Sequence, residues 1–519
     1  MTDLPRGEQL VLAVDLGTGG PKVGFVSVTG KVAWQDHVTV ETTWLGDGGA
    51  EQDADLWWRL ICDTVRHAVA DGAVPADQVV AAAITGQWAS TVPVDDKGQP
   101  VADCVMWMDT RGGRHVRPVI GGRVAGYKAK NAFTWIRRTG AAPSPNGDDP
   151  IGHMLFLEHD CPDVASSARW FLEPVDYLSM RLSGVAAASP ASMVAAWLTD
   201  NRHLDRLGYD EELLRLSGVD VAKLPPLHPT CSVVGTVLDD VASDLGLPSG
   251  VQVVTGTPDV HSAACGAGAV RDYETHMAIS TTSWISAPVP FKKTDIAHSI
   301  VSIPGLTPDG YLMVNNQDSA GRCFEWLRDN VLGLDYAALL DLAAEAPPGS
   351  GGVVFTPWLK GERSPVDDRR ARGGFHNLSL ATDRAHLARA VLEGVAYNAR
   401  WLHEFVEKFA KRRMDPIRLV GGGGVSDLWC QIYADVMDRS IERVADPLNA
   451  QLRGAAIFAG LALGVVRWDE VRDLVSIDAA FRPDPATRQA YDRLYAEFPK
   501  LYKSQKAMFA RLNKRQRPA

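Results

Sequence analysis

The stretch VLAVDLGTGGPKVGFVSV, residues 11–28, places an aspartate, three glycines, a threonine and a lysine between two apolar runs. The β-branched and apolar residues on both sides predict two strands joined by a tight turn. Glycine reaches positive φ without strain, so a plain β-hairpin is one interpretation. A turn that binds phosphate through its backbone N–H groups is the other. The rest of the chain has to decide between them.

Four residues of this turn have the chemistry that a phosphate site needs. Glycines such as Gly17 leave backbone N–H groups unobstructed, so that a phosphate oxygen can approach closely. Thr18 adds a hydroxyl and Lys22 a positive charge. Asp15, at the end of the first predicted strand, can hold Mg²⁺ directly or through water. The alternative is a simple hairpin that carries a surface lysine.

Length, composition and charge limit the classes of protein to consider. The chain has 519 residues, more than one ordinary domain, so about two to four domains are expected. A hydrophobic fraction of 46% and a charged fraction of 22% are ordinary for a globular protein. The net charge is −10 and no basic stripe is present, which argues against nucleic acid as a partner. The short basic run RLNKRQRPA, 511–519, is typical of a solvated helix end.

Three features favour a cytoplasmic protein with no membrane partner. The N-terminus lacks the basic region and apolar stretch of a signal peptide. No uncharged apolar run approaches the ~20 residues of a membrane span. The seven cysteines are scattered, without a CxxC pair, in apolar surroundings. They are expected to be buried free thiols, which fits a reducing compartment.

The order of predicted strands and helices repeats along the chain. The first hundred residues predict three strands, a helix that ends at Gly72, and a buried strand VVAAAITG. The first glycine turn joins two adjacent strands, so it is not the strand-to-helix turn of a Rossmann fold or a P-loop. Later, THMAISTTSWISAPV predicts a second hairpin, and a long helix and further strands follow it. Two related α/β domains with a cleft between them would produce this repeat.

Two more clusters follow predicted strands. In GTPDVHSAACGAG, 256–268, Asp259 would lie at a cleft and accept a proton from a hydroxyl. The alternative is that Asp259 is the N-cap of the next helix. GGGGVSDLW, 421–429, has four consecutive glycines, which lose much conformational freedom on folding. Something such as a nucleotide base or ribose is therefore expected to approach the backbone there. Ser426 is expected to cap the following helix.

These three motifs, in this order and separation, resemble those of the FGGY carbohydrate kinases, members of the actin/Hsp70/hexokinase-like ATPase superfamily. The segment 84–112 resembles the family segment in which GQ precedes substrate contacts and a W-x-D-x-R element. The segment 355–375 resembles its P-x-L-x-GER-x-P stretch, and HLARAVLEGVAYN resembles the helix of its second signature. The resemblance extends from about residue 10 to 465 and is strongest to the xylulokinase branch.

The resemblance implies an α/β fold with two actin/Hsp70/hexokinase-like ATPase domains, ribonuclease H-like in topology, and an interdomain cleft. It implies transfer of the γ-phosphate of ATP, with Mg²⁺, to a hydroxyl of a sugar or polyol. Asp259 would be the catalytic base and Asp15 the Mg²⁺-associated carboxylate. The nucleotide-binding residues would be Gly17, Thr18 and Lys22 of the first phosphate loop, Thr281 of the second, and Gly421, Gly422, Gly423 and Gly424 beside the adenosine.

The same resemblance predicts where the domains lie. An N-terminal domain at 1–262 would bind the sugar and provide the first phosphate loop. An irregular insertion within it, from about 112 to 235, would complete a substrate pocket. A C-terminal domain at 263–470 would provide the second phosphate loop and the adenosine site, followed by a helical extension at 471–519.

The chain departs from the family pattern mainly at positions that are expected to recognise the acceptor. Xylulokinases have Met-His after GQ, and glycerol kinases have Arg-Glu, whereas this chain has Trp88 and Ala89. Val260 replaces the polar residue that usually follows the catalytic aspartate, and Ser280 replaces the glycine that opens the second phosphate loop. A site built for one pattern of hydroxyls rejects others strongly, which puts D-xylulose itself in doubt. Further departures are His153, Phe156 and Asn377.

Seven residues are candidates for contact with the acceptor: Gln87, Trp88, Ala89, Asp109, Arg111, Asp259 and Val260. Trp88 either stacks on the apolar face of a carbohydrate or is an ordinary core aromatic. Asp109 and Arg111 either contact the substrate or form a buried ion pair that supports their loop, and we favour the ion pair.

Two functions from different classes stay open at this point. The first is an ATP-dependent, xylulokinase-like kinase for a small ketose or sugar alcohol, with ribulose, erythrulose, a tetritol or pentitol, gluconate and glycerol as other acceptors. The second is a catalytically silent relative that senses a sugar or nucleotide. The oligomeric state is open too, with a homodimer among the alternatives.

Overall fold

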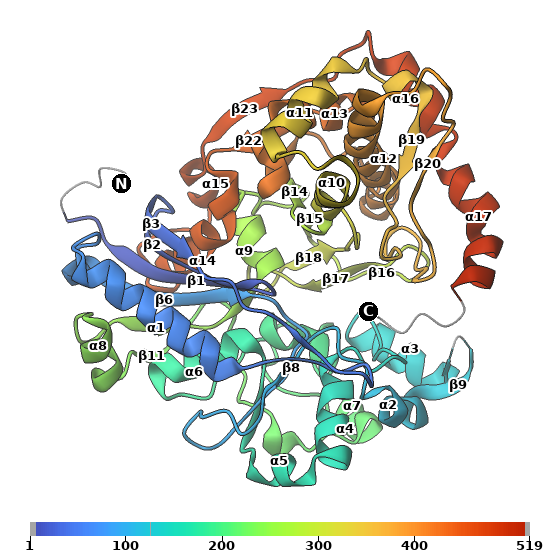
Figure 1. Cartoon of the computed structure of the whole chain (residues 1–519). Helices are drawn as coiled ribbons and strands as arrows, with labels where there is room; N and C mark the ends of the chain where they lie inside the picture. Colours follow the sequence, from blue (N-terminus) through green and yellow to red (C-terminus); the bar gives the residue numbers. More distant parts are fainter. Residues whose placement is uncertain (1–6, 125, 514–519) are drawn as a thin grey trace.

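Two mixed β-sheets with helices on their faces form the molecule, which confirms the expected two-domain α/β fold (Figure 1). The structure is a computed structural model, which describes residues 7–124 and 126–513. Residues 1–6, part of the segment used to argue against a signal peptide, lie outside the described residues. So do residues 514–519, most of the basic C-terminal run.

The quoted stretch forms the hairpin at the centre of the N-terminal sheet. Strands β1 (Leu10–Gly17) and β2 (Gly20–Ser27) are antiparallel, with Asp15 opposite Lys22. On the other side of β1, strand β6 (Val79–Gly86) runs parallel to it. The sheet order is β11-β12-β6-β1-β2-β3, and β13 also pairs with β6. The remaining strands are β3 (Val32–His37), β11 (Val233–Thr236), β12 (Gln252–Val254) and β13 (Thr257–Pro258).

The C-terminal sheet repeats this arrangement. Its hairpin consists of β14 (Thr275–Ile279) and β15 (Ser283–Val289), and β21 (Ile417–Val420) runs parallel to β14. The strand order is β16-β17-β18-β15-β14-β21-β22-β23. Its outer strands are β16 (Thr294–Asp295), β17 (Ile300–Pro304), β18 (Tyr311–Val314), β22 (Ile441–Val444) and β23 (Ile477–Phe481). In both sheets the antiparallel hairpin is followed by a parallel strand on the side of its first strand.

Two helices follow the start and stop signals in the sequence. Helix α1 (Ala54–Ala70) starts after Asp53, whose side chain accepts hydrogen bonds from the first turn, and Gly72 follows with a positive φ. Ser426 caps α13 (Asp427–Met437) by accepting from the Trp429 N–H, as expected. The long helix α12 (Arg384–Ala410) is buried along much of its length. Other helices outside the insertion are α8 (Asp239–Leu245), α10 (Gly321–Leu327), α11 (Tyr336–Glu345), α15 (Val471–Leu474), α16 (Arg488–Tyr495) and α17 (Phe498–Leu512).

The regular structure of the insertion is mainly helical, and the insertion lies below the N-terminal sheet in Figure 1. Its helices are α2 (Gly113–Ile120), α3 (Ala129–Arg138), α4 (Pro150–Asp160), α5 (Pro162–Ser167), α6 (Pro174–Ser183) and α7 (Glu211–Ser217). Small sheets brace the loops: β4 (Thr43–Trp44) with β5 (Ala50–Gln52) and β8 (Cys104–Val105), β7 (Val92–Val94) with β10 (Trp170–Leu172), and β19 (Val354–Thr356) with β20 (Gly374–His376). The remaining strand is β9 (Gly121–Val124).

Two helices cross between the sheets. Helix α9 (Asp259–Gly266) and helix α14 (Ala450–Ala462) approach so closely that side chains are excluded at the crossing. A Cβ on Gly266 would lie 1.8 Å from the Ala450 carbonyl oxygen, and one on Gly454 would lie 1.9 Å from the Ser262 carbonyl oxygen. Although α14 follows the C-terminal sheet in sequence, it packs on β1, β2 and β6 of the N-terminal sheet. The two domains are therefore joined through this helix pair.

The domain limits stay a prediction. The predicted boundary after residue 262 falls inside α9, the helix that joins the two domains. The segment 471–519 contributes α16 and α17, but it also supplies β23 to the edge of the C-terminal sheet. All seven cysteines are free, five of them buried. Within the described parts of the chain, we find no helix both long and apolar enough to cross a membrane.

Candidate functional site

Sheet register brings three predicted site residues to one edge of the N-terminal sheet. Asp15 of β1 pairs with Thr85 of β6, and Pro258 of β13 pairs with Gly86 at the end of β6. Gln87 and Asp259 are the next residues after these paired strands. The carboxyl ends of parallel strands meet at the same edge, where ligands of open α/β sheets commonly bind. Asp15, Gln87 and Asp259 therefore converge although more than 240 residues separate the first from the last.

Asp259 is the first residue of α9 and remains partly exposed. The N-cap interpretation is wrong, because Pro258 occupies that position and the helix has no side-chain capping bond. Burial, reinforced by the negative charge of Asp15, raises the pKa of Asp259 to about 7. Burial raises the pKa of Asp15 to about 6, and the positive charge of Lys22 partly opposes it. A carboxylate with a pKa near neutrality suits a general base.

Thr18 joins the hairpin turn to the acceptor side. Its hydroxyl donates to Gln87 Oε1 (3.2 Å) and accepts from the Trp107 indole N–H (3.0 Å). Gln52 Nε2 donates to the Thr18 carbonyl (2.9 Å). The amide nitrogen of Gln87 is buried and has no hydrogen-bond partner among the described residues. Buried polar groups are nearly always paired, so this nitrogen is available to donate to a ligand or to water.

Trp107 is a site residue that the sequence reasoning missed. It belongs to the W-x-D-x-R element, of which we had selected only Asp109 and Arg111. From the sequence, a tryptophan in a loop is most simply interpreted as a core residue. Its hydrogen-bond partner Thr18 is 89 positions away in the chain. The signal that could have found it is the element itself, which places Trp107 two residues before the aspartate.

Lys22 connects the first phosphate loop to the C-terminal domain. Its ammonium donates to the Leu448 carbonyl oxygen at 2.7 Å. The Leu448 side chain in turn is the nearest group to Gly422, at 3.9 Å from the position of an added Cβ. The hairpin turn of one domain and the glycine loop of the other are thus adjacent. In this conformation the lysine charge is engaged with a backbone carbonyl.

Thr281 is exposed at the tip of the β14–β15 hairpin. Its carbonyl accepts from the Ala320 N–H (3.0 Å), and the Ser280 carbonyl accepts from Gly321 (2.8 Å). These bonds fix the tip against the start of α10 and leave the Thr281 hydroxyl on the surface. Ser280 replaces the usual glycine and is exposed, so its side chain is accommodated without a clash.

The four glycines have different environments. A Cβ on Gly421 would lie 2.5 Å from the Ile279 carbonyl oxygen, and Gly421 has φ +87°. A Cβ on Gly423 would lie 2.5 Å from Ile279 Cγ2, whereas Gly424 is buried near Pro447. Gly422 is exposed, and an added Cβ there would make only an ordinary van der Waals contact with Leu448, at 3.9 Å. Packing against β14 therefore explains Gly421 and Gly423, and Gly422 is the residue of this loop that a nucleotide can approach most closely.

The departures near the acceptor form an apolar cluster. Val260 is buried with Trp284 of β15, and Trp88 packs against the same cluster. Trp88 keeps partial exposure, so the structure leaves both its stacking role and its core role open. Ala89 has φ +63°, a left-handed conformation that costs a non-glycine residue about 1–2 kcal/mol. Such strain persists only where the surroundings hold the loop.

Asp109 and Arg111 form the buried ion pair that we favoured. Arg111 bonds Asp109 (2.7 Å) and Glu51 (2.5 Å), and its guanidinium lies over the Phe156 ring at 4.2 Å. The Asp109 carboxylate is fully buried and also accepts from the Ala50 N–H (2.9 Å). Their charges are used within the protein, in support of the loop that carries Trp107.

Two further departures have local explanations. Burial lowers the pKa of His153 to about 4, so the ring is neutral near pH 7, and Nδ1 lies 3.3 Å from the Thr91 hydroxyl. Asn377, which stands where the family signature that its sequence resembles has a glycine, has φ +62°, a conformation that asparagine tolerates better than most residues.

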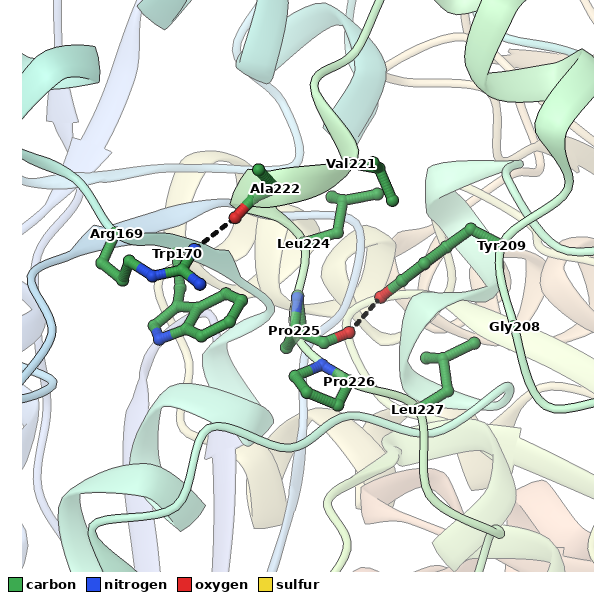
Figure 2. Close-up of a pocket in the computed structure, with 10 residues that line it drawn as sticks. All are labelled: Arg169, Trp170, Gly208, Tyr209, Val221, Ala222, Leu224, Pro225, Pro226 and Leu227. Carbon is green, nitrogen blue, oxygen red and sulfur yellow. Dashed lines mark hydrogen bonds between the residues drawn. The ribbon is translucent and has the colours of Figure 1, made fainter.

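A pocket of about 360 Å³ lies within the insertion (Figure 2). It is lined mainly by apolar side chains, with the Tyr209 hydroxyl donating to the Pro225 carbonyl (2.7 Å). None of its lining residues is a predicted site residue.

The donor set suits a magnesium-bound nucleotide better than a metal held by protein alone. Among the described residues, no group of three or more His, Cys, Asp or Glu side chains is placed to bind a metal. Mg²⁺ is usually held by one or two carboxylates together with substrate phosphates and water. Asp15, with its raised pKa beside Asp259, lies where a divalent cation would relieve the crowding of negative charge. The residues present therefore fit Mg²⁺ with ATP.

Comparison with known proteins identifies the class. Residues 10–266 match the N-terminal domain, and residues 274–463 the C-terminal domain, of the FGGY family of carbohydrate kinases. The chain belongs to the FGGY family of carbohydrate kinases. It is accordingly a sugar phosphotransferase, as the sequence resemblance implied.

Individual relatives are similar over almost the whole chain. A xylulose kinase of Staphylococcus epidermidis is 26% identical and covers 97% of this chain and 99% of its own length. A gluconokinase of Bacillus subtilis is 23% identical, with 94% of each chain covered. In structure, the chain resembles xylulose kinase from Lactobacillus acidophilus with a TM-score of 0.85, at 22% identity, covering 97% of this chain and all of the other.

Proposed function

We propose that this chain is an ATP-dependent kinase that phosphorylates a hydroxyl of a small ketose or sugar alcohol, with a xylulokinase-like acceptor class. The observation that carries the proposal is the meeting of Asp15, Gln87 and Asp259 at one sheet edge. The relative named as a xylulose kinase supports the acceptor class. Trp88, Ala89 and Val260 are reasons to expect an acceptor other than D-xylulose.

In this proposal Asp259 accepts the proton of the acceptor hydroxyl as the oxygen attacks phosphorus. Bound Mg·ATP would supply the phosphoryl group and much of the positive charge that phosphoryl transfer requires. Asp15 would hold the metal ion. The Thr18 backbone N–H and the Lys22 ammonium from one domain, and Thr281 from the other, would donate to phosphate oxygens. For this, Lys22 exchanges its present partner, the Leu448 carbonyl, while the Thr18 hydroxyl keeps its bond to Gln87.

Gln87 and Trp107 position the acceptor in this scheme. The unpaired Gln87 amide donates to an acceptor oxygen, while its Oε1 stays bonded to Thr18. Approach of the two domains excludes water, which would otherwise compete as the phosphoryl acceptor. Lys22 already bonds the other domain through the Leu448 carbonyl, so it is placed to respond to both domain closure and phosphate binding.

A sugar acid is a second candidate acceptor, favoured by a cluster of positive charge. Lys360 lies 5.9 Å from the centroid of the Trp107 ring. The charged groups that act on it are Asp318 and three arginines, Arg322, Arg363 and Arg369. Arg363 and Arg369 pair with Asp318, at 3.7 and 2.7 Å. An excess of cations beside an acceptor residue favours a carboxylate on the substrate. The relative named as a gluconokinase agrees with this candidate.

One assay separates these possibilities. Purified protein with Mg·ATP is tested by coupled ADP release against ketopentoses, tetruloses, pentitols, glycerol and aldonates such as gluconate. Highest kcat/KM for an uncharged sugar supports the first proposal, and highest kcat/KM for an aldonate supports the second. Absence of turnover on every acceptor, with ATP binding retained in calorimetry, would identify the silent sensor instead.

We propose a cytoplasmic location for the enzyme. The free thiols support a cytoplasmic location, because disulfides are rare in that compartment. The partners would be the small-molecule acceptor and Mg·ATP, without nucleic acid or membrane. Light scattering of the purified chain would decide between a monomer and the homodimer that stays open.

A further inference from the structure

A buried carboxylate outside the proposed machinery holds the acceptor loop. Glu173 is the N-cap residue of α6, only 1% exposed, yet its side chain makes no capping bond to that helix. N-cap side chains ordinarily accept from the first turn of their own helix. Instead, Glu173 Oε2 accepts from the Ser90 backbone N–H (3.2 Å), and the Ala89 N–H also faces the carboxylate.

These two N–H groups belong to the loop that reads the acceptor. The loop includes Gln87, Trp88 and Ala89, which directly precede Ser90. Ala89 has the left-handed backbone conformation. Buried backbone N–H groups that lack a hydrogen-bond partner destabilise the folded state. Without the Glu173 carboxylate, the loop would therefore change from its strained conformation to a relaxed one. Glu173 is therefore placed to hold this conformation.

The contact continues from the loop into the first phosphate turn. Ser90 Oγ accepts from the Trp107 backbone N–H (2.9 Å). The Trp107 indole donates to the Thr18 hydroxyl (3.0 Å), which donates to Gln87 Oε1 (3.2 Å). Four hydrogen bonds thus lead from a helix of the insertion, through Ser90 and Trp107, to the groups beside Asp15 and Asp259.

We propose that Glu173 is a positioning residue for the acceptor: through the backbone of Ala89 and Ser90 it sets the loop that presents Gln87 and Trp88. This inference rests on the proposed kinase function. The insertion thereby controls acceptor binding without touching the acceptor itself. Lys22, Thr281 and the glycine loop lie outside this series of bonds, so nucleotide binding is expected to depend much less on Glu173 than acceptor binding does.

The test compares Glu173→Met with Glu173→Gln, using the acceptor with the highest kcat/KM for the wild type. Methionine keeps the length of the side chain but offers the loop no oxygen, whereas glutamine keeps one. We expect Glu173→Met to lower kcat/KM for the acceptor about tenfold to a hundredfold, mainly through KM, with a much smaller change in KM for ATP. We expect Glu173→Gln to stay within about threefold of the wild type.

The matched control is Asp435→Asn in α13, a buried acid that also accepts from a backbone N–H, that of Asp484 (2.8 Å), and lies in the other domain. It should leave both KM values near those of the wild type. If Glu173→Met does not fold, Ser90→Ala removes the next bond of the series and is expected to raise KM for the acceptor in the same selective way.

Three results would overturn the inference. The first is an equal loss of kcat/KM for the acceptor in Glu173→Gln and Glu173→Met. The second is a change in KM for ATP that parallels the change in KM for the acceptor in Glu173→Met. The third is a drop in the thermal stability of Glu173→Met with KM for the acceptor unchanged. Lack of turnover by the wild type on every acceptor would refute the kinase proposal instead, so the two failures are distinguishable.

Discussion

At the residue scale, the environment of Asp259 determines what this carboxylate can do. The side chain is partly exposed at the start of α9, and its pKa is raised by burial and by Asp15. An ordinary surface aspartate would be fully ionised and a weak base. Asp259 is instead a base of intermediate strength beside a second carboxylate. That combination suits proton transfer better than a structural role.

Replacing Asp259 by asparagine should remove catalysis and keep nucleotide binding. Asn has nearly the same shape but cannot accept the acceptor's proton, so kcat should fall at least ~10²–10⁴-fold. ADP release measures turnover, and calorimetry measures ATP affinity. The control is Asp309→Asn on an exposed turn, which should behave as the wild type. Near-normal turnover of Asp259→Asn would remove this residue from the role of base.

At the scale of elements, the loop between β21 and α13 combines packing and access. Gly421 and Gly423 lie against Ile279, the last residue of β14, so they bring the two elements into contact. Gly422, between them, is exposed. The run of glycines therefore has two physical causes, close strand packing and an exposed backbone position, that the sequence motif does not separate.

Two alanine substitutions separate these causes. Gly423→Ala should destabilise the protein by about 1–3 kcal/mol, because its Cβ would overlap Ile279. Gly422→Ala should leave the unfolding temperature unchanged and raise KM for ATP about tenfold if adenosine lies against this position. Thermal unfolding and steady-state kinetics provide the two measurements. An unchanged KM for ATP in Gly422→Ala would place the adenosine elsewhere.

The hairpin of β14 and β15 contains a histidine that predicts a pH effect on stability. His276 is fully buried, its Nε2 accepts from the Trp284 indole (3.2 Å), and burial lowers its pKa to about 3. The unfolded chain takes up the proton near pH 6.5 while the folded one does not, so stability falls as pH falls below that value. At pH 5 this contribution amounts to about 2 kcal/mol.

His276→Gln should remove this part of the acid sensitivity, since glutamine can still accept from Trp284 but does not titrate. Denaturant unfolding at pH 7 and pH 5 should show the wild type losing about 2 kcal/mol more than the variant. The exposed His203→Gln serves as the control. Identical losses for wild type and His276→Gln would contradict the assignment.

At the scale of the whole molecule, the crossing of α9 and α14 connects the two sheets. Gly266 and Gly454 allow backbone contact at the crossing, and Asp259 lies one to two turns away at the start of α9. Lys22 adds a second connection through Leu448. If the two domains move toward each other, we expect them to rotate about this crossing, which lies close to Asp259.

Gly454→Ala should disturb this crossing. Its Cβ would lie 1.9 Å from the Ser262 carbonyl, which only separation of the helices can relieve. We expect a loss of about 3 kcal/mol in stability and a reduced kcat, measured by denaturant unfolding and ADP release. Gly208→Ala, where an added Cβ meets open space, is the control and should change neither.

Local patterns sufficed for the hairpins, the long helices and the position of Asp259 after a strand. Alternation of apolar residues, glycine turns and caps act over a few residues, so they can be read without the fold. The family resemblance then supplied the class of enzyme and the identity of the paired motifs. What it could not supply was the role of each glycine in GGGG, since Ile279 lies 142 positions before Gly421 in the chain.

The long-range partners of Trp107 and Glu173 became apparent only in the folded chain. Trp107 bonds a hydroxyl 89 positions away, and Glu173 bonds a backbone N–H 83 positions away. Nothing in the local sequence of either residue signals such a partner, because a loop tryptophan and a glutamate before a helix have ordinary local explanations. Long-range pairing depends on how sheets and insertion pack, and packing is a property of the whole chain.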